Sequence, residues 1–216
     1  GHLGFKSEQI NDPSYALERI VPEVIEAVRP FEQSIGRDIP VVPAGGIYTG
    51  ADILKYMRMG AAGVQMATRF VTTDECDASP EFKAAYVEAR PEDIVIIKSP
   101  VGMPGRAIRN GFINDVGEGK RKPYKCPYHC LLTCDYQNSP YCIALALMNA
   151  KKGKLKNGFA FAGANAFREK AIVPVKTLMD SLQEEFETAA RPQAASGWTP
   201  GAPVSEGQEP GAPKPT

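Results

Sequence analysis

The segment from Pro40 to Phe70, PVVPAGGIYTGADILKYMRMGAAGVQMATRF, constrains the fold more than any other part of this sequence. It begins and ends with short apolar runs, which are typical of strands buried on both faces of a parallel sheet. Between them, GADILKYMRMGA has the apolar spacing of a helix, with Thr49 placed to cap its start and Gly60 to end it. Strands that alternate with helices over short connections predict an α/β fold with a parallel sheet.

Both predicted strands end in residues with little side-chain bulk, apart from Gln65 and Met66. The two tips consist of Ala44, Gly45, Gly46, Gln65, Met66, Ala67 and Thr68. Free backbone N–H groups at a strand end that precedes a helix favour an anion, and adjacent strands bring two such ends together. In (β/α)8 barrels the loops after the last two strands commonly build a phosphate site. We therefore expect the tips to bind a phosphate-bearing ligand. The alternative, that the glycines only permit tight turns, remains open.

The remaining chain continues the alternation of helix and strand. Apolar residues at helical spacing predict helices over residues 15–31, 79–90, 141–150 and 174–190. EDIVIIKSP predicts a further strand over residues 92–100. The next stretch, VGMPGRAIRNGFINDV, predicts a Gly/Pro loop that opens a helix at about Arg106.

Composition narrows the class of protein. A hydrophobic share of 43% is enough for a core, and the 25 basic and 25 acidic residues offer no electrostatic footprint for nucleic acid or an anionic membrane. No apolar run approaches the roughly 20 residues that span a bilayer, and the start of the chain does not have the pattern of a signal peptide. The odd count of five cysteines favours reduced thiols. We therefore expect a cytoplasmic protein with a small-molecule substrate.

Four cysteines crowd into a short stretch with the spacing C-x3-C-x3-C-x7-C. They are Cys126, Cys130, Cys134 and Cys142. Four soft ligands this close together could hold an iron–sulfur cluster or a structural zinc. The alternative is a set of buried free thiols that pack as small apolar groups. The spacing matches none of the common metal-binding patterns, so both interpretations stay open.

The 40–70 segment resembles the phosphate-binding end of FMN-dependent barrels that include nitronate monooxygenases (2-nitropropane dioxygenases) and flavin-type enoyl-acyl-carrier-protein reductases. GHLGF, residues 1–5, resembles the end of that group's Gly-Gly-His-x-Gly motif. SPVGMPGRAIRN, residues 99–110, resembles its Gly-x-Pro-x-Arg-x-x-x-Asn segment. The Cys-rich stretch, followed by GFAFAGANAFR, resembles a subgroup of nitronate monooxygenases. The resemblance covers residues 1 to about 185. It departs at Ala67, where the family often has glycine and where a methyl group narrows the approach to the phosphate.

The resemblance implies that the strand tips hold the phosphate of FMN and that His2 faces the flavin ring as a general base. Without it, a Gly-His at the start of a chain would be a frayed end with no role. Arg106, Arg109 and Asn110 are candidates to orient a carboxylate, a nitro group or a phosphate, because guanidinium donors fit such groups. A solvated helix start is the alternative for these three residues.

The implied fold is the C-terminal half of a (β/α)8 TIM barrel with a small Cys-rich appendage, within a longer protein. Residues 1–120 would form the barrel part with an inserted substrate-side segment, 121–187 the Cys-rich and helical appendage, and 188–216 a disordered tail rich in Pro, Gly and Ala. The implied function is oxidation of an alkyl nitronate by dioxygen. The alternatives are an NAD(P)H-dependent flavin reductase of the enoyl-thioester type and a non-catalytic phosphate- or metal-binding module. The sequence does not determine the oligomeric state, and a homodimer is one open assembly.

Overall fold

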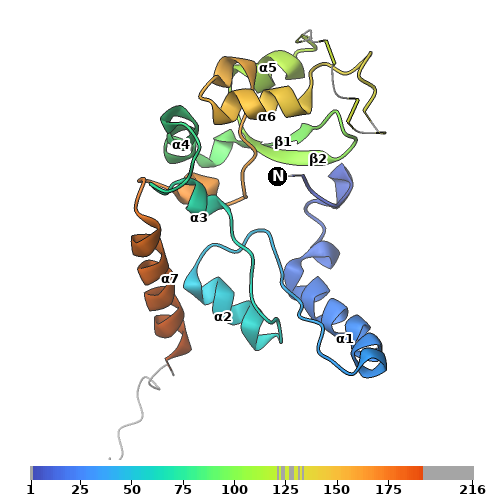
Figure 1. Ribbon diagram of the computed structural model, residues 1–216, viewed down its shortest axis with the longest axis vertical. Helices are drawn as coiled ribbons and strands as arrows, with labels where there is room; N and C mark the ends of the chain where they lie inside the picture. Colours follow the sequence, from blue (N-terminus) through green and yellow to red (C-terminus); the bar gives the residue numbers. More distant parts are fainter. Residues whose placement is uncertain are drawn as a thin grey trace, which may run out of the picture.

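The computed structural model describes residues 2–120, 122, 125–126, 129–130, 132 and 134–191, which form a mixed α/β fold (Figure 1). The predicted tail starts inside the last helix, and its part from residue 192 onward lies outside the described residues. The α-helices are α1 (Leu17–Ile35), α2 (Gly50–Arg58), α3 (Thr68–Val71), α4 (Pro80–Val87), α5 (Gly111–Gly117), α6 (Ile143–Lys151) and α7 (Val175–Ala190). The strands are β1 (Ile94–Lys98) and β2 (Pro104–Ile108). Short 3-10 turns are η1 (Ser7–Gln9), η2 (Pro13–Tyr15), η3 (Pro91–Asp93), η4 (Leu155–Asn157) and η5 (Ala166–Arg168).

β1 and β2 form an antiparallel pair in which Ile96 lies opposite Arg106. The predicted helix start at Arg106 is therefore wrong, because the chain reverses at Gly102, which has a φ of 89°, and residues 104–108 pair with β1. The helix that was expected there, α5, begins only at Gly111. Along its other edge β2 forms isolated bridges with His2 and with the segment around Phe161.

The two strands predicted in the 40–70 segment lie side by side but do not form a regular parallel sheet in the described residues. Ala44 and Gln65 form a single parallel bridge, and the N–H of Gln65 donates to the carbonyl of Pro43 at 2.9 Å. Pro40 and Pro43 have no N–H to donate, which interrupts the ladder. The second predicted strand is also shorter than expected, because α3 begins at Thr68.

The buried side chains form three groups. One lies between the hairpin and the helices α5 and α6, around Ala107, Phe112 and Phe159. Another joins α4 to β2 through Tyr86 and Ile108. The third joins α1 to α2 and includes Val21, Ile47, Tyr56 and Ala61. None of the described helices has the length and apolar character that crossing a membrane requires.

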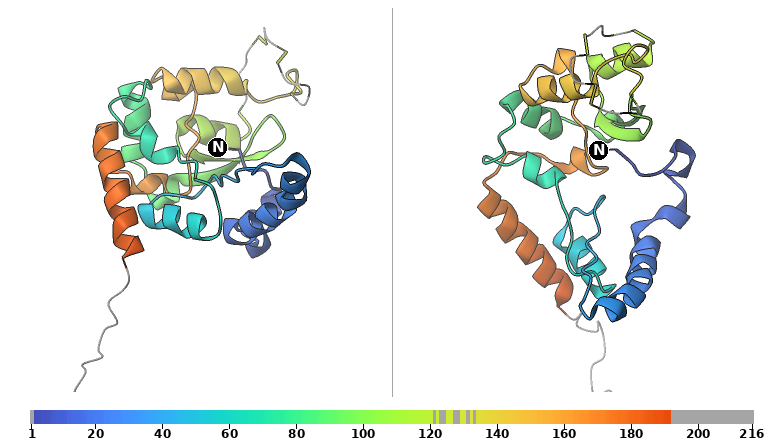
Figure 2. Two further views of the ribbon diagram at one scale, coloured as in Figure 1. Left: turned by 60° about the horizontal axis from the view of Figure 1, so that its bottom comes forward. Right: turned by 45° about the vertical axis from the view of Figure 1, so that its right-hand side comes forward.

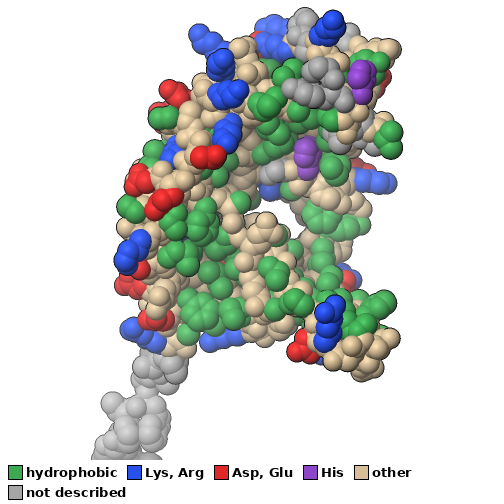
Figure 3. All heavy atoms as spheres, in the orientation of Figure 1, with side chains coloured by type: hydrophobic (Ala, Val, Ile, Leu, Met, Phe, Trp, Pro, Cys, Tyr) green, Lys and Arg blue, Asp and Glu red, His purple; other side chains and the backbone are tan. Residues whose placement is uncertain are grey.

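In space-filling view a hollow separates the part that carries the hairpin from the part that carries α1 and α2 (Figure 3). The start of the chain lies beside β2 (Figure 1). The strand tips and the hairpin therefore belong to different parts of the molecule and have to be connected by other segments.

α7 packs along α2, although more than a hundred residues separate them in sequence (Figure 2). At the start of α2 the backbone of Gly50 lies so close to α7 that a Cβ there would overlap the backbone of Leu182 and Phe186. The carboxylate of Glu185 accepts the N–H of Gly50 at 2.7 Å and also pairs with Arg69 at 3.1 Å. Through these contacts α7 binds the segment that follows the first strand tip.

Glu185 should make stability depend on pH. Burial alone would raise its pKa, but the hydrogen bonds from Gly50 and Arg69 outweigh burial and hold the pKa below its ordinary value. A depressed folded-state pKa stabilises the fold above the unfolded pKa, about 4.3, and this contribution is lost as pH falls through the folded pKa. We expect Glu185→Gln to lower Tm at pH 7 by about 2–4 °C, or about 1 kcal/mol for a partly exposed pair.

The deficit of Glu185→Gln should shrink towards zero in acid, where the wild-type carboxyl group is itself neutral. Calorimetric melts at a series of pH values between 7 and 3 measure this difference. Glu184→Gln is the matched control, because Glu184 is exposed and pairs with no cation among the described residues. A deficit that stays constant over the whole range would contradict the assigned role of the Glu185 charge.

Candidate functional site

The first strand tip is open and requires glycine. Gly45 and Gly46 have φ values of 99° and 74°, which residues with side chains rarely adopt, and space for a Cβ is free at both positions. The chain beyond them is held by Asp52, whose carboxylate accepts the N–H groups of Tyr48 at 3.0 Å and Thr49 at 2.8 Å. Thr49 in return caps the N–H of Asp52 at 3.1 Å, as its sequence position predicts.

The second tip lies beside the first and is fixed to it. The parallel bridge between Ala44 and Gln65 places the two strand ends next to each other. Arg69, one residue after this tip, donates from Nη1 to the carbonyl of Tyr48 at 3.2 Å and to Glu185. Ala67 is exposed, so no side chain fills the space above it. We call residues 44–46 and 65–68 together the strand-tip cup.

The cup keeps donors free for a ligand. Among the described residues, no acceptor takes the backbone N–H of Gly46, Ala67 or Thr68, and the Thr68 hydroxyl also has no described partner. Unpaired N–H groups beside small residues are the donor set that a phosphate monoester requires. The residues present therefore fit the phosphate end of FMN.

A third segment reaches the cup, and sequence reasoning assigned it no role. Asn165 donates from Nδ2 to the carbonyl of Gly46 at 3.0 Å. Gly163 packs directly against the Thr68 hydroxyl. The run of small residues in FAGANAF was the available signal, but its partner lies about a hundred residues earlier in the chain. Such a contact cannot be read from local pattern.

His2 lies at the edge of the hairpin. The N–H of the next residue, Leu3, donates to the carbonyl of Pro104 at 2.8 Å, and His2 itself bridges Gly105. Its Nε2 forms a 2.8 Å hydrogen bond with the hydroxyl of Ser99, and its ring lies 4.7 Å from the ring of Phe161. Partial burial lowers the pKa of His2 below its ordinary value of 6.5. The neutral imidazole is therefore the dominant form at pH 7.

The three polar residues of the 99–110 segment differ in their surroundings. Arg106 is partly buried, which lowers its pKa, and no carboxylate among the described residues pairs with it. Arg109 is exposed. Asn110 is occupied, because its Oδ1 caps α5 at the N–H of Ile113 and its Nδ2 donates to the carbonyls of residues 155 and 158.

This arrangement separates the three substrate candidates. Asn110 has a structural role that accounts for its hydrogen-bonding groups. Arg106 follows Gly105 in β2, and neighbouring strand positions point to opposite faces of a sheet. The side chain of Arg106 therefore points to the face of the sheet opposite that of Gly105, the residue that bridges His2. That Arg106 or Arg109 orients an anionic group stays a prediction.

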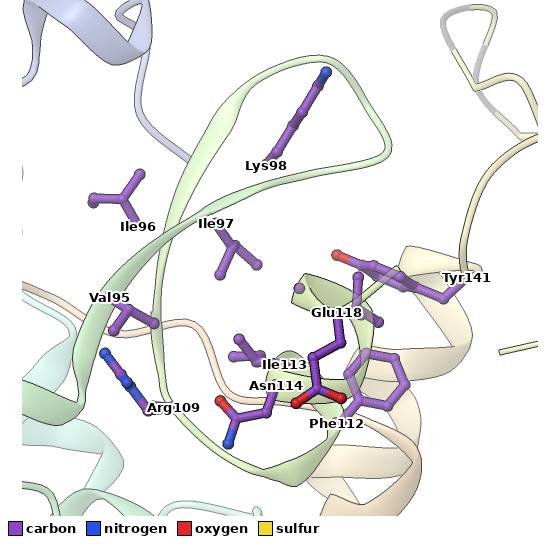
Figure 4. Close-up of a pocket in the computed structure, with 12 residues that line it drawn as sticks. Val95, Ile96, Ile97, Lys98, Arg109, Phe112, Ile113, Asn114, Glu118 and Tyr141 are labelled. Carbon is purple, nitrogen blue, oxygen red and sulfur yellow. The ribbon is translucent and has the colours of Figure 1, made fainter. Parts of the chain in front are cut away.

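A cavity of about 510 Å³ lies between β1 and α5, away from the strand-tip cup (Figure 4). Its floor is apolar, with Ile97, Ile113 and Phe112, while Arg109 and Glu118 stand among its polar lining residues. Neither His2 nor any residue of the cup lines it. The cavity is thus separate from His2 and the strand-tip cup, whereas the substrate candidate Arg109 lines it.

The four clustered cysteines are free thiols in the structure. Within the part of the chain that is described, no group of three or more His, Cys, Asp or Glu side chains could hold a metal ion. Cys130 is exposed, whereas Cys142 directly precedes α6. The structure gives the predicted iron–sulfur or zinc site no support.

Comparison with known proteins places these features in context. A family model described as "Nitronate monooxygenase" matches residues 1–185. A protein of Staphylococcus saprophyticus named "Probable nitronate monooxygenase" is 36% identical over 120 residues, and one from Staphylococcus aureus strain Newman with the same name is 33% identical over 119 residues. Each match covers 55% of this chain and 31% of the relative.

Two solved structures are similar over most of the chain. FabK from Thermotoga maritima superposes with a TM-score of 0.64 at 26% identity, over 87% of this chain and 51% of that one. A nitroalkane oxidase from Streptomyces ansochromogenes superposes with a TM-score of 0.59 at 26% identity, over 88% of this chain and 49% of that one. The chain therefore spans about half the length of the solved structures and a smaller share of the curated relatives.

Proposed function

Because this chain belongs to the nitronate monooxygenase family, we propose that it carries the phosphate-binding and proton-transfer parts of an FMN-dependent oxidoreductase that oxidises alkyl nitronates with dioxygen. The observation that carries the proposal is the strand-tip cup. Two adjacent chain segments there leave backbone N–H groups and one hydroxyl without acceptors, beside glycines that keep the space above them open. A phosphate monoester satisfies such donors.

The proposed fold is the C-terminal half of a (β/α)8 barrel. The likeness to FabK supports it, since 87% of this chain superposes on 51% of that one. The parallel bridge between Ala44 and Gln65, followed by free N–H groups, is consistent with two neighbouring barrel strands that end at a phosphate. The boundaries at residues 120 and 187 and the Cys-rich appendage stay predictions.

The chemistry divides between cofactor and chain. When bound, FMN supplies the electron transfer from substrate to dioxygen, which no side chain of this protein can perform. The strand-tip cup holds the phosphate end. A nitronate has already lost its α-proton, so His2 acts as a base on the neutral nitroalkane: it takes up the proton from the α-carbon and leaves the nitronate, because a neutral imidazole is a competent base. If Nε2–H donates to Ser99, Nδ1 keeps its lone pair for that proton.

Flavin spectroscopy tests the proposal. The purified protein that carries these residues should bind FMN, with a visible flavin spectrum, and anaerobic addition of an alkyl nitronate should bleach it. Rapid bleaching by NADH or NADPH instead would favour the flavin reductase. A folded protein that stays colourless and binds no FMN would favour the non-catalytic module.

A further inference from the structure

We propose that residues 161–165 form a third wall of the strand-tip cup, in which Gly163 and Asn165 position the phosphate-binding groups. The inference rests on the proposed function, because it concerns the FMN phosphate. It adds residues from the C-terminal part of the chain to a site that sequence patterns located only in the 40–70 segment.

Asn165 holds one peptide group of the cup in place. Its side-chain N–H donates to the carbonyl of Gly46 at 3.0 Å. In a trans peptide the carbonyl and the following N–H point in opposite directions. Fixing the Gly46 carbonyl on the side of Asn165 therefore turns the N–H of Ile47 to the other side. That N–H has no acceptor among the described residues.

Gly163 leaves room for the Thr68 hydroxyl. The Cα of Gly163 lies so close to this side chain that a Cβ would overlap Oγ1. Thr68 is the first residue of α3 and has a stiff, β-branched side chain. Any side chain at position 163 would push it away from its place in the cup. The glycine thus sets the direction of a side-chain donor on the second strand tip.

The same segment is anchored to the hairpin that carries His2. The N–H of Ala162 donates to the carbonyl of Arg106 at 3.0 Å, and Phe161 bridges Ala107. The ring of Phe161 also lies 4.7 Å from that of His2. Two residues span at most about 7 Å of extended chain, so the contact with His2 and the contact with Thr68 are held at a fixed, short separation. The segment therefore joins the base to the cup.

Binding of two ligands separates this role from a structural tether. FMN carries the phosphate, whereas riboflavin has the same ring without it. Loss of one hydrogen bond in the cup is expected to raise the Kd of Asn165→Ala for FMN about fivefold to tenfold. Gly163→Ala should do the same through Thr68. The Kd for riboflavin should stay within about twofold in both variants.

Asn149→Ala is the matched control, because Asn149 lies outside the strand-tip cup, is partly exposed, and donates from its side chain to the carbonyl of Asn157 at 3.2 Å. Asn165→Leu keeps about the same side-chain size without a donor or a charge, and it replaces Asn165→Ala if that variant fails to fold. Fluorescence titration gives both constants, and melts without ligand verify folding. Unchanged FMN affinity, or equal losses for FMN and riboflavin, would overturn the inference. Wild-type protein that binds no FMN would refute the proposed function instead.

Discussion

His2→Asn is expected to lower kcat/KM for a neutral nitroalkane, the carbon acid that His2 deprotonates, by about 100- to 10,000-fold, the usual contribution of a positioned general base. FMN affinity should change little, because His2 contacts Ser99 and Phe161 and lies outside the strand-tip cup. Asparagine keeps a polar side chain near Ser99 but cannot take up the proton. Steady-state oxygen consumption and FMN titration on the same preparation measure the two effects separately.

The pH profile gives this prediction a second readout. Because desolvation lowers the pKa of His2, the acid limb of wild-type kcat/KM should have its midpoint below pH 6.5. This acid limb should disappear in His2→Asn. His129→Asn is the control, since His129 is exposed and packs against Tyr136 away from the hairpin. A His2→Asn enzyme with more than half of the wild-type kcat/KM would rule out the assigned base.

Gly50→Ala is expected to destabilise the protein by about 3 kcal/mol, the upper range for forcing a methyl group into packed surroundings. Alanine is the better helix former, so propensity alone would predict a gain. The loss arises because a Cβ would overlap backbone atoms of Leu182 and Phe186 in α7, and backbone cannot turn aside as a flexible side chain can. For a chain of this size the corresponding fall in Tm is about 6–12 °C.

Gly117→Ala is the matched control for this helix contact. Gly117 ends α5, is exposed and has open space where its Cβ would lie. Its Tm should stay equal to that of the wild type or rise slightly. Calorimetry on both variants decides the matter. A Gly50→Ala protein that melts with the wild type would mean that α2 and α7 can separate freely at this point.

Local pattern predicted the helices well. The helices predicted over residues 15–31, 79–90, 141–150 and 174–190 correspond to α1, α4, α6 and α7, and Thr49 caps α2 as expected. These signals are local, since apolar spacing and capping residues act within a few turns of the chain. The strand over residues 92–100 was likewise found as β1.

Strand pairing explains where the structure departs from the predicted elements. The residues around Arg106 have the local pattern of a helix start, but they pair with β1 as a strand. The strands predicted around Pro43 and Met66 form only one bridge, because prolines cannot donate to a ladder. The side chain of Asn110 caps α5 and reaches residues 155 and 158, and its role toward a substrate stays a prediction.

The sequence by itself determined where the backbone is bare: Gly45 and Gly46 have φ values open chiefly to glycine, and that requirement is local. It also determined the family, through short motifs in a fixed order. Only the tertiary structure decided which residues surround the backbone of Gly45 and Gly46. Asn165 and Gly163 reach the strand tips because the chain returns to them about a hundred residues later, and a hydrogen bond between such distant segments leaves no periodic trace in the sequence.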